Sequence, residues 1–291
     1  MDKKTIIITP KPEDNEVQLL KKELEGRGFI VEYFIPANYK ANIDTFEQNF
    51  ADIHPKGALV RGFGADVTQK IFFRLDLLSV LEEFGFRLIN SRQSLEVASD
   101  KFLSSLFLKK YKLPTPRTIV CENSQDALNS FDELGGDVIL KPLYGSKGIG
   151  ITRLNNKDFA ENVIYTLEQL NEIFYLQEFV EHYNRDIRIL VVGDKVVDGM
   201  YRVSDTWKTN IHAGAQMKPI DLNEELKELA IKAAKATKTE IAGVDIIESE
   251  QGYQILEVNS IPGFTALQKV SKRNITAEII EYFIKTIEIW K

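Results

Sequence analysis

Apolar and polar residues alternate along the chain in the pattern of short strands separated by amphipathic helices. Four apolar runs rich in β-branched residues favour buried strands: residues 5–9, 29–35, 57–61 and 87–90. Residues 16–25 and 71–84 place their apolar side chains on one helical stripe, and each segment ends at a glycine. Because strands that alternate with helices form parallel sheets with helices on their faces, we predict an α/β unit over residues 1–96.

The pattern changes around the sequence Leu-Pro-Thr-Pro at residues 113–116, which is typical of a rigid extended connector. Before it we expect a helix that Ser94 or Ser99 caps and that runs to about residue 110. Strands with interspersed helices are expected at residues 118–121, 125–134, 138–141, 148–154, 157–170 and 174–179. The sequence therefore predicts a small α+β unit over residues 97–180.

A third unit is expected over residues 181–291. Its predicted elements are strands at 186–192, 195–202, 243–248 and 254–259 and helices at 223–237 and 275–287. No internal repeat and no low-complexity tract interrupts the chain.

Composition narrows the classes of function. The 291 residues are 44% hydrophobic and carry a net charge of −6, which argues against a nucleic-acid partner. The single cysteine, Cys121, excludes an intrachain disulfide framework and a multi-cysteine metal site. We find no apolar stretch of membrane-spanning length and no signal-peptide pattern, so we expect a cytoplasmic globular protein without a membrane partner.

Three oxygen donors in two apolar strands are the strongest chemical signal. Glu257 and Asn259 are two residues apart, so they share one face of a strand, and Asp245 reaches the same face if it pairs with Glu257. That register also pairs Ser249 with Tyr253 and leaves a three-residue loop ending at Gly252. Two carboxylates so close repel unless a cation lies between them, so we predict a divalent metal site. Exposed carboxylates on a surface hairpin are the alternative.

Upstream, Lys141 ends an apolar strand and is followed at once by a glycine-rich loop. Three glycines in six residues, at 145, 148 and 150, suit a backbone that turns its N–H groups toward phosphate oxygens. Since residues 149–152 have strand character, we predict the mobile tip of a hairpin. A solvated lysine and an ordinary glycine hairpin are the competing interpretations.

Several polar side chains between these two signals could contact anions. Arg188 and Arg202 are each able to bind a carboxylate or phosphate through two parallel N–H groups, although structural ion pairing is equally compatible. Lys208 and Asn210 are a cationic and a neutral donor on one loop. His212 is a lone histidine and more typical of a structural role.

Taken in order, these segments resemble the ATP-grasp superfamily, and within it the RimK-like carboxylate–amine ligases. The resemblance covers about residues 60–270 and rests on these motifs: Lys141-Pro142 with its glycine loop, Gln177-Glu178-Phe179-Val180, Asp186-Ile187-Arg188, Lys208-Thr209-Asn210-Ile211-His212, Asp245-Ile246, and residues 257–264, Glu-Val-Asn-Ser-Ile-Pro-Gly-Phe. It implies an ATP-grasp fold behind an N-terminal parallel-sheet domain.

The resemblance also assigns roles. It implies ATP-binding residues at Lys101, Lys141, Gly145, Ser146, Gln177, Glu178, Phe179, Val180, Asp186, Lys208, Thr209 and Asn210. It implies two Mg²⁺ ions, with Mn²⁺ as an alternative, at Asp245, Glu257 and Asn259. Arg202 is expected to steady the acyl phosphate and the tetrahedral oxyanion, and Arg61 and Arg188 to bind substrate.

The implied reaction joins an amino acid, most often glutamate in this family, to an acceptor carboxylate through an acyl phosphate. Residues 60–64, 73–76 and 89–91 are most similar to the branch that glutamylates pterin or deazaflavin cofactors. The alternatives are the same ligation on a protein tail or acidic carrier, and a nucleotide-binding regulatory module without catalysis. A homo-oligomer is expected by resemblance alone.

Overall fold

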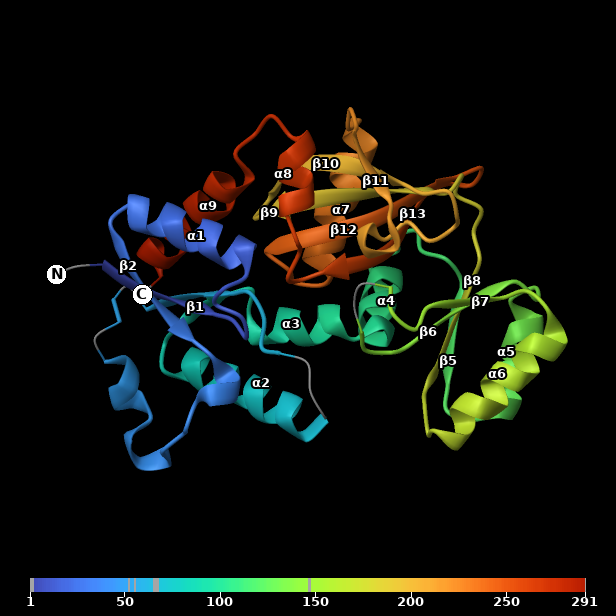
Figure 1. Cartoon of the computed structure of the whole chain (residues 1–291), viewed down its shortest axis with the longest axis horizontal. Coiled ribbons are helices and arrows are strands. Elements are labelled where there is room, and N and C mark those ends of the chain that lie inside the picture. The colour runs from blue at the N-terminus through green and yellow to red at the C-terminus, as the bar shows by residue number, and fades with distance from the viewer. Residues whose placement is uncertain (1–2, 52, 55, 65–67, 146–147, 291) are drawn as a thin grey trace.

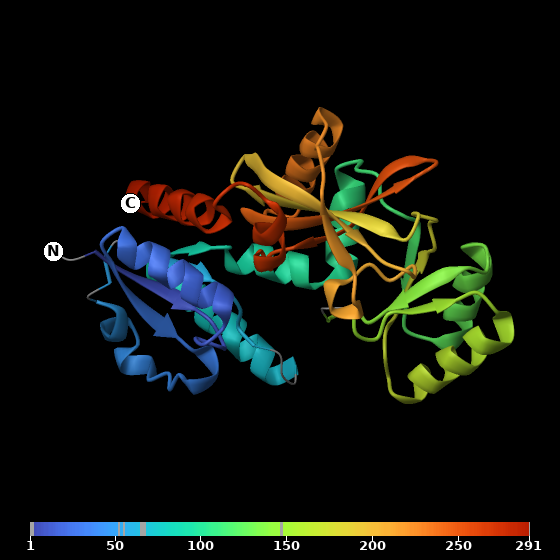
Figure 2. The ribbon, with the colours of Figure 1, turned by 45° about the horizontal axis from the view of Figure 1, so that its top comes forward.

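The computed structural model describes residues 3–51, 53–54, 56–64, 68–145 and 148–290. These residues form three β-sheets with helices packed against them (Figure 1). The N-terminal sheet and the second sheet lie at opposite ends of the molecule, and the third sheet lies between them (Figures 1 and 2). No helix in the described ranges is long and apolar enough to cross a membrane.

The N-terminal sheet is parallel, with the strand order β2-β1-β3-β4. Its strands are β1 (Lys3–Ile8), β2 (Phe29–Phe34), β3 (Gly57–Val60) and β4 (Arg87–Ile89). The helices α1 (Asn15–Gly26) and α2 (Thr68–Glu83) connect β1 to β2 and β3 to β4, and the short helices η1 (Pro36–Asn38), η2 (Ile43–Thr45) and η3 (Glu47–Phe50) lie between β2 and β3. The predicted α/β arrangement is confirmed.

Two helices replace the single helix expected before the proline connector. They are α3 (Arg92–Ser99) and α4 (Lys101–Lys110). The cap of α3 is Ser91, whose hydroxyl accepts from the Ser94 amide, and the cap of α4 is Asp100, whose carboxylate accepts from the Leu103 amide. The prediction that Ser94 or Ser99 caps the helix is therefore wrong.

The second sheet is antiparallel, with the order β5-β8-β6-β7. Its strands are β5 (Thr118–Cys121), β6 (Val138–Lys141), β7 (Thr152–Leu154) and β8 (Phe174–Glu178), and its helices are α5 (Ser124–Glu133) and α6 (Lys157–Gln169). The predicted strand at 148–154 begins only at Thr152, because Gly148 and Gly150 adopt positive φ angles of 74° and 80° that a strand does not accommodate.

The third sheet is antiparallel and has the order β11-β10-β9-β12-β13. Its strands are β9 (Arg185–Val192), β10 (Lys195–Val203), β11 (Gln216–Pro219), β12 (Ile241–Ser249) and β13 (Gly252–Asn259). The helices after β10 are η4 (Ile211–Ala213), α7 (Glu224–Ala236), α8 (Thr265–Val270) and α9 (Ile275–Ile289). The sequence did not predict β11 or α8, which are the shortest strand and α-helix of this unit.

The hydrophobic cores do not follow the order of the chain. Leu20 and Leu24 of α1 share a core with Phe283 of α9 and Leu190 of β9, so the C-terminal helix closes the N-terminal sheet. Leu108 of α4 packs on the other face of the third sheet, with α7. The division at residues 96 and 180 stays a prediction.

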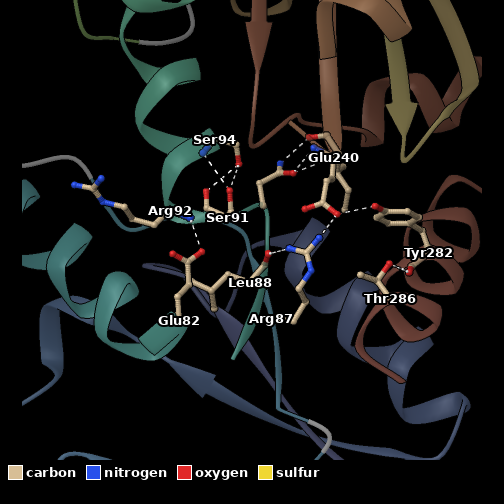
Figure 3. A network of polar contacts seen from close by, with 11 residues as sticks. Glu82, Arg87, Leu88, Ser91, Arg92, Ser94, Glu240, Tyr282 and Thr286 are labelled. Carbon is tan, nitrogen blue, oxygen red and sulfur yellow. Dashed lines mark hydrogen bonds and ion pairs between the residues drawn. The ribbon is translucent and has the colours of Figure 1, made fainter. Parts of the chain in front are cut away.

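A polar network joins the N-terminal sheet to the third sheet (Figure 3). Arg87 of β4 pairs with Glu240 at 2.5 Å, and the Tyr282 hydroxyl donates to the same carboxylate at 2.7 Å. Asn90, which is buried, accepts from the amides of Glu240 and Ile241 and donates to the Ile241 carbonyl. The end of β4 is therefore tied to the start of β12.

Glu16 makes a second joint between the same two units. One of its carboxylate oxygens accepts from the amides of Phe264 and Thr265 at 2.6 and 2.8 Å and from the Thr265 hydroxyl at 3.0 Å. The other oxygen pairs with Arg61 at 2.8 Å. Arg61 also donates to the Pro262 carbonyl and lies over the Phe264 ring. This ion pair fixes the segment that follows β13 against α1 and β3.

We expect Glu16→Ala to lower the free energy of unfolding by about 3 kcal/mol, because it leaves the buried Arg61 guanidinium without its counter-ion. Urea denaturation followed by circular dichroism measures the change. Glu25→Ala, which removes an exposed ion pair with Lys21 on the same helix, is the matched control and is expected to cost under about 1 kcal/mol. Equal effects of the two substitutions would contradict the joint.

Candidate active site

A cleft lies where the second and third sheets meet. Ile139 and Lys141 of β6 and Gln177 of β8 form one wall, and β9, β10, β12 and β13 form the other. The segment after β8 and the loop after β10 close its ends. Twelve of the predicted site residues line this cleft: Lys141, Gln177, Glu178, Phe179, Val180, Asp186, Arg202, Lys208, Thr209, Asn210, Asp245 and Glu257.

Strand register gathers five charged side chains on one face of the third sheet. Asp186 and Arg188 are two apart on β9 and therefore share a face. Arg202 of β10 lies opposite Asp186, and Asp245 of β12 lies opposite Arg188. Glu257 of β13 is opposite Asp245. Three strand pairings thus place these charged side chains together on one face of the third sheet.

Arg202 is the centre of this group. Its guanidinium makes two hydrogen bonds to Asp186, at 2.7 and 2.5 Å, and a third contact of 3.0 Å to Asp245. The Thr209 hydroxyl donates to Asp186 at 2.6 Å. Burial by itself lowers the pKa of Arg202, but the charges of Asp245 and Asp186 outweigh it and raise that pKa above its ordinary value. Arg202 is therefore a permanent cation held by two acids.

Asp245 is shared between two arginines. Arg188 makes two hydrogen bonds to its carboxylate, from Nε and, at 2.9 Å, from Nη2. Burial opposes ionisation of Asp245, yet the positive charges of Arg188 and Arg202 hold its pKa below the usual range. Asp245 is thus an ionised carboxylate in a nearly solvent-free place.

A β-bulge in β13 shapes the wall beside these acids. Asp245 pairs with Glu257 as predicted, but Ile246 pairs with Ile255, so Leu256 is an extra residue in the ladder. Ser249 consequently pairs with Gly252 rather than with Tyr253, and the predicted three-residue loop is wrong. The bulge turns both Leu256 and Glu257 toward the cleft.

Lys141 is the buried cation of the opposite wall. Its side chain donates to Gln177 at 2.6 Å and its Nζ lies 5.8 Å from the centre of the Tyr175 ring. Burial is the main cause that lowers the pKa of Lys141 to about 8; the charge of Glu257 opposes the shift and that of Lys101 adds to it. An anion bound in the cleft would raise this pKa and stabilise the charged amine.

The glycine loop is joined to both sides of the cleft. Lys101 Nζ donates to the Gly145 carbonyl at 3.3 Å, and the Tyr144 hydroxyl donates to Asp100 at 3.1 Å. A methyl group on Gly148 would lie 2.5 Å from Asn210 Oδ1, so the loop approaches the segment after β10 closely. Ser146 lies outside the described residues.

Three other predicted residues lie outside the cleft lining. Asn259 donates from its side-chain nitrogen to Glu257 at 3.1 Å and to the Gly243 carbonyl at 3.2 Å. Arg188 pairs with Asp245, which lines the cleft, but is not itself part of the lining. Arg61 contacts Glu16, Pro262 and Phe264, so its observed partners belong to the joint between units, and its substrate-binding role stays a prediction without support from these contacts.

The structure adds lining residues that the sequence did not single out: Pro116, Ile139, Ile151, His182, Trp207, Ile247 and Leu256. His182 is buried and its ring nitrogens lie 2.8 and 3.0 Å from the carbonyl oxygens of Val180 and Trp207. It therefore fixes the segment after β8 to the loop after β10. No motif marks the apolar members, because a pocket wall and a core residue have the same sequence pattern.

Carboxylate and amide oxygens are ligands that hard divalent cations prefer. Asp245 and Glu257 lie opposite each other, and Asn259 follows Glu257 on β13. Within the described ranges no group of three His, Cys, Asp or Glu side chains could hold a metal ion. The predicted set therefore depends on the Asn259 amide as its third ligand. A cation would also have to share Asp245 with Arg188 and Arg202.

Comparisons with known proteins agree with this geometry. Residues 98–283 match the RimK-like ATP-grasp domain. Tetrahydromethanopterin:alpha-L-glutamate ligase of Methanococcus maripaludis is 38% identical over 242 residues, which cover 81% of this chain and 82% of the relative. Alpha-aminoadipate–LysW ligase LysX of Saccharolobus solfataricus is 33% identical over 208 residues, covering 69% and 76%. The RimK domain ATP-grasp protein of Sphaerobacter thermophilus aligns with a TM-score of 0.76 at 18% identity, covering 97% of this chain and 99% of the other.

A parallel N-terminal sheet followed by two antiparallel sheets that enclose a charged cleft defines an ATP-grasp ligase fold. The chain belongs to the RimK-like ATP-grasp family and is a carboxylate–amine ligase. The predicted fold class and family are thereby confirmed.

The pKa of Lys141 predicts how stability depends on pH. Since the folded pKa is about 8 and the unfolded value about 10.5, the unfolded chain binds more protons between these values, and the wild type gains stability as pH rises. Lys141→Met has no titrating amine at this position, so its stability lacks this dependence on pH. We expect the free energy of unfolding of the wild type to rise by about 3 kcal/mol relative to that of the variant between pH 8 and 10.5. Urea denaturation across that range measures it, with the exposed Lys232→Met as a control that gives no such trend.

Proposed function

We propose that this ligase joins glutamate to the carboxylate of a small cofactor-type acceptor such as a pterin, through an acyl phosphate. The observation that carries the proposal is the convergence of Lys141, Arg202, Asp245 and Glu257 on one cleft. The choice of glutamate follows the alpha-L-glutamate ligases among the relatives. The choice of acceptor follows the 38% identical tetrahydromethanopterin ligase.

In this proposal ATP lies between the two sheets. Lys101, Lys141, Lys208 and Asn210 hold its phosphates, and residues 178–180 contact the adenine with backbone groups. Gly145, Ser146, Thr209 and Asp186 complete the nucleotide site. The lowered pKa of Lys141 supports its part, because a phosphate bound beside this desolvated ammonium would offset the hydration that burial removes.

Asp245, Glu257 and Asn259 are the residues that would hold two Mg²⁺ ions, and the metal would neutralise charge on the transferred phosphoryl group. Arg202 sits beside Asp245 in the same cleft, so its guanidinium is available to stabilise the acyl phosphate and the oxyanion that forms when the amine attacks. Because Asp186 holds Arg202 from the far side, that charge is preorganised.

A carrier protein is the second candidate acceptor. Alpha-aminoadipate–LysW ligases of three organisms are 33–34% identical to this chain, close to the value for the pterin ligase. The two acceptors differ in size and in the surface they need, so they are separable by experiment. The linkage through the α or γ carboxylate and the oligomeric state are outside the proposal.

An ADP-release screen tests the proposed function. The purified protein is given ATP, Mg²⁺ and L-glutamate with pterin carboxylates in one arm and acidic peptides in the other. We expect amino-acid-dependent ADP release and a product heavier by one glutamyl residue in the pterin arm. If product forms only in the peptide arm, the acceptor is a protein rather than a pterin. If ADP is released only with another amino acid, glutamate is not the amino-acid substrate.

Glu257→Gln tests the metal-binding role. We expect ligation to fall by at least about a hundredfold, because an amide of the same shape lacks the charge that binds a divalent cation, while the unfolding midpoint changes little. ADP release and thermal denaturation measure the two quantities. Glu248→Gln, on the partner strand at the exposed Arg185 ion pair, is the control and should retain full activity. Full activity of Glu257→Gln would exclude Glu257 as a ligand.

A further inference from the structure

Arg188 and Arg202 bind Asp245 in different ways. Arg202 has a second carboxylate partner, Asp186, to which it makes both of its shortest contacts. Arg188 makes two hydrogen bonds to Asp245, and among the described residues no other carboxylate lies within ion-pairing distance of it. If Asp245 turned to another cation, Arg202 would keep its partner and Arg188 would lose its own.

The two arginines and the two aspartates of this face balance in charge, and Glu257 adds a negative charge opposite Asp245. Two arginines, 188 and 202, face two aspartates, 186 and 245, and all are largely buried, with Arg188 the most exposed at 14%. A buried charge left without a partner is costly, so the balance must be kept when a further charge enters. A divalent cation at Asp245 and Glu257 would bring positive charge next to Arg188.

An anion that replaced Asp245 as the partner of Arg188 would lie beside the Arg188 guanidinium. A methyl group on Gly243 would lie 2.8 Å from Arg188 Nη1 and equally close to the Pro262 ring. The guanidinium therefore lies beside the segment that follows β13, and it is not part of the lining of the nucleotide cleft. A planar guanidinium with two parallel N–H groups is suited to a carboxylate.

We propose that Arg188 and the metal are alternative partners of Asp245, so that metal binding releases Arg188 to bind a substrate carboxylate. Metal and carboxylate then bind with positive coupling, and each raises the affinity of the other by the same factor. The inference rests on the proposed function, because it takes the metal and the carboxylate substrates from it. It makes Arg188 a positioning residue for the metal and a binding residue for the substrate.

Without Arg188, Asp245 has one competitor fewer, so the affinity for the metal should rise. Removal of a nearby positive charge also favours a cation by electrostatics alone. The loss of coupling between metal and carboxylate is therefore the result that separates this proposal from a purely structural ion pair, which predicts no coupling through Arg188.

The experiment uses Mn²⁺ as the probe ion with the full chain at saturating ADP. Enhancement of the water-proton relaxation rate reports protein-bound Mn²⁺. Titrations are made alone, with L-glutamate, and with N-acetyl-L-glutamate, a dicarboxylate that lacks the free amine. Coupling with L-glutamate alone assigns Arg188 to the amino acid, and coupling with the blocked compound assigns it to the acceptor side.

For the wild type we expect at least one dicarboxylate to tighten Mn²⁺ binding by about fivefold or more, which is the lower end of ordinary coupling. For Arg188→Gln we expect tighter Mn²⁺ binding without dicarboxylate and no further change with it. The variant should fold, because Arg202 still pairs with Asp245. Arg185→Gln is the matched control, since Arg185 lies on the same strand and pairs with Glu248 of β12 outside the cleft. It should behave as the wild type.

Unchanged or weaker Mn²⁺ binding by folded Arg188→Gln would overturn the competition for Asp245. No effect of either dicarboxylate on the wild type would overturn the coupling. These outcomes are independent of ligation, which the ADP-release screen measures separately. Failure of that screen would remove the proposed reaction, whereas failure here would leave it standing.

Discussion

The buried ion pairs around Arg202 are the constraint on which the site depends. Arg202 lies on β10, Asp186 on β9 and Asp245 on β12, so one guanidinium ties together three neighbouring strands. Buried ion pairs add little net stability, because desolvation offsets most of the attraction. Their value here is in geometry: they hold a positive charge in a fixed position facing the cleft that we propose as the site of ligation.

The N-terminal unit supports that geometry from outside the cleft. Glu16 and Arg61 hold the segment after β13, and Asn90 holds the start of β12. The strands β12 and β13, which carry Asp245 and Glu257, are thus fixed at the end that faces the N-terminal sheet. The C-terminal helix α9 packs on α1 and completes the same interface. A change in the position of the N-terminal unit would therefore reach Asp245 and Glu257 through their own backbone.

Most of the secondary structure could be predicted from sequence because it depends on local signals, whereas most of the cleft residues were predicted from the resemblance of the ordered motifs to the ATP-grasp ligases. Apolar runs indicated the strands, glycines ended the helices, and the pairing of Asp245 with Glu257 followed from strand alternation. Contacts between distant residues could not be predicted. The partners of Arg61, Glu16 and Pro262, are 45 and 201 residues away, so the joint between units has no local signal, and the substrate role of Arg61 stays a prediction. The helix caps at Ser91 and Asp100 were missed because several serines near residue 94 offer the same signal.

The β-bulge at Leu256 has a consequence for comparing this chain with its relatives. Side chains along β13 alternate between the two faces of the sheet. Because of the extra residue, this alternation in the part near the turn is independent of that in the part near Asn259. One added or lost residue in such a hairpin can be absorbed at the bulge, and the two acids still meet. The number of residues between Asp245 and Glu257 could therefore change by one without moving the two acids apart. An alignment that penalises gaps evenly across this hairpin would separate residues that are equivalent in space.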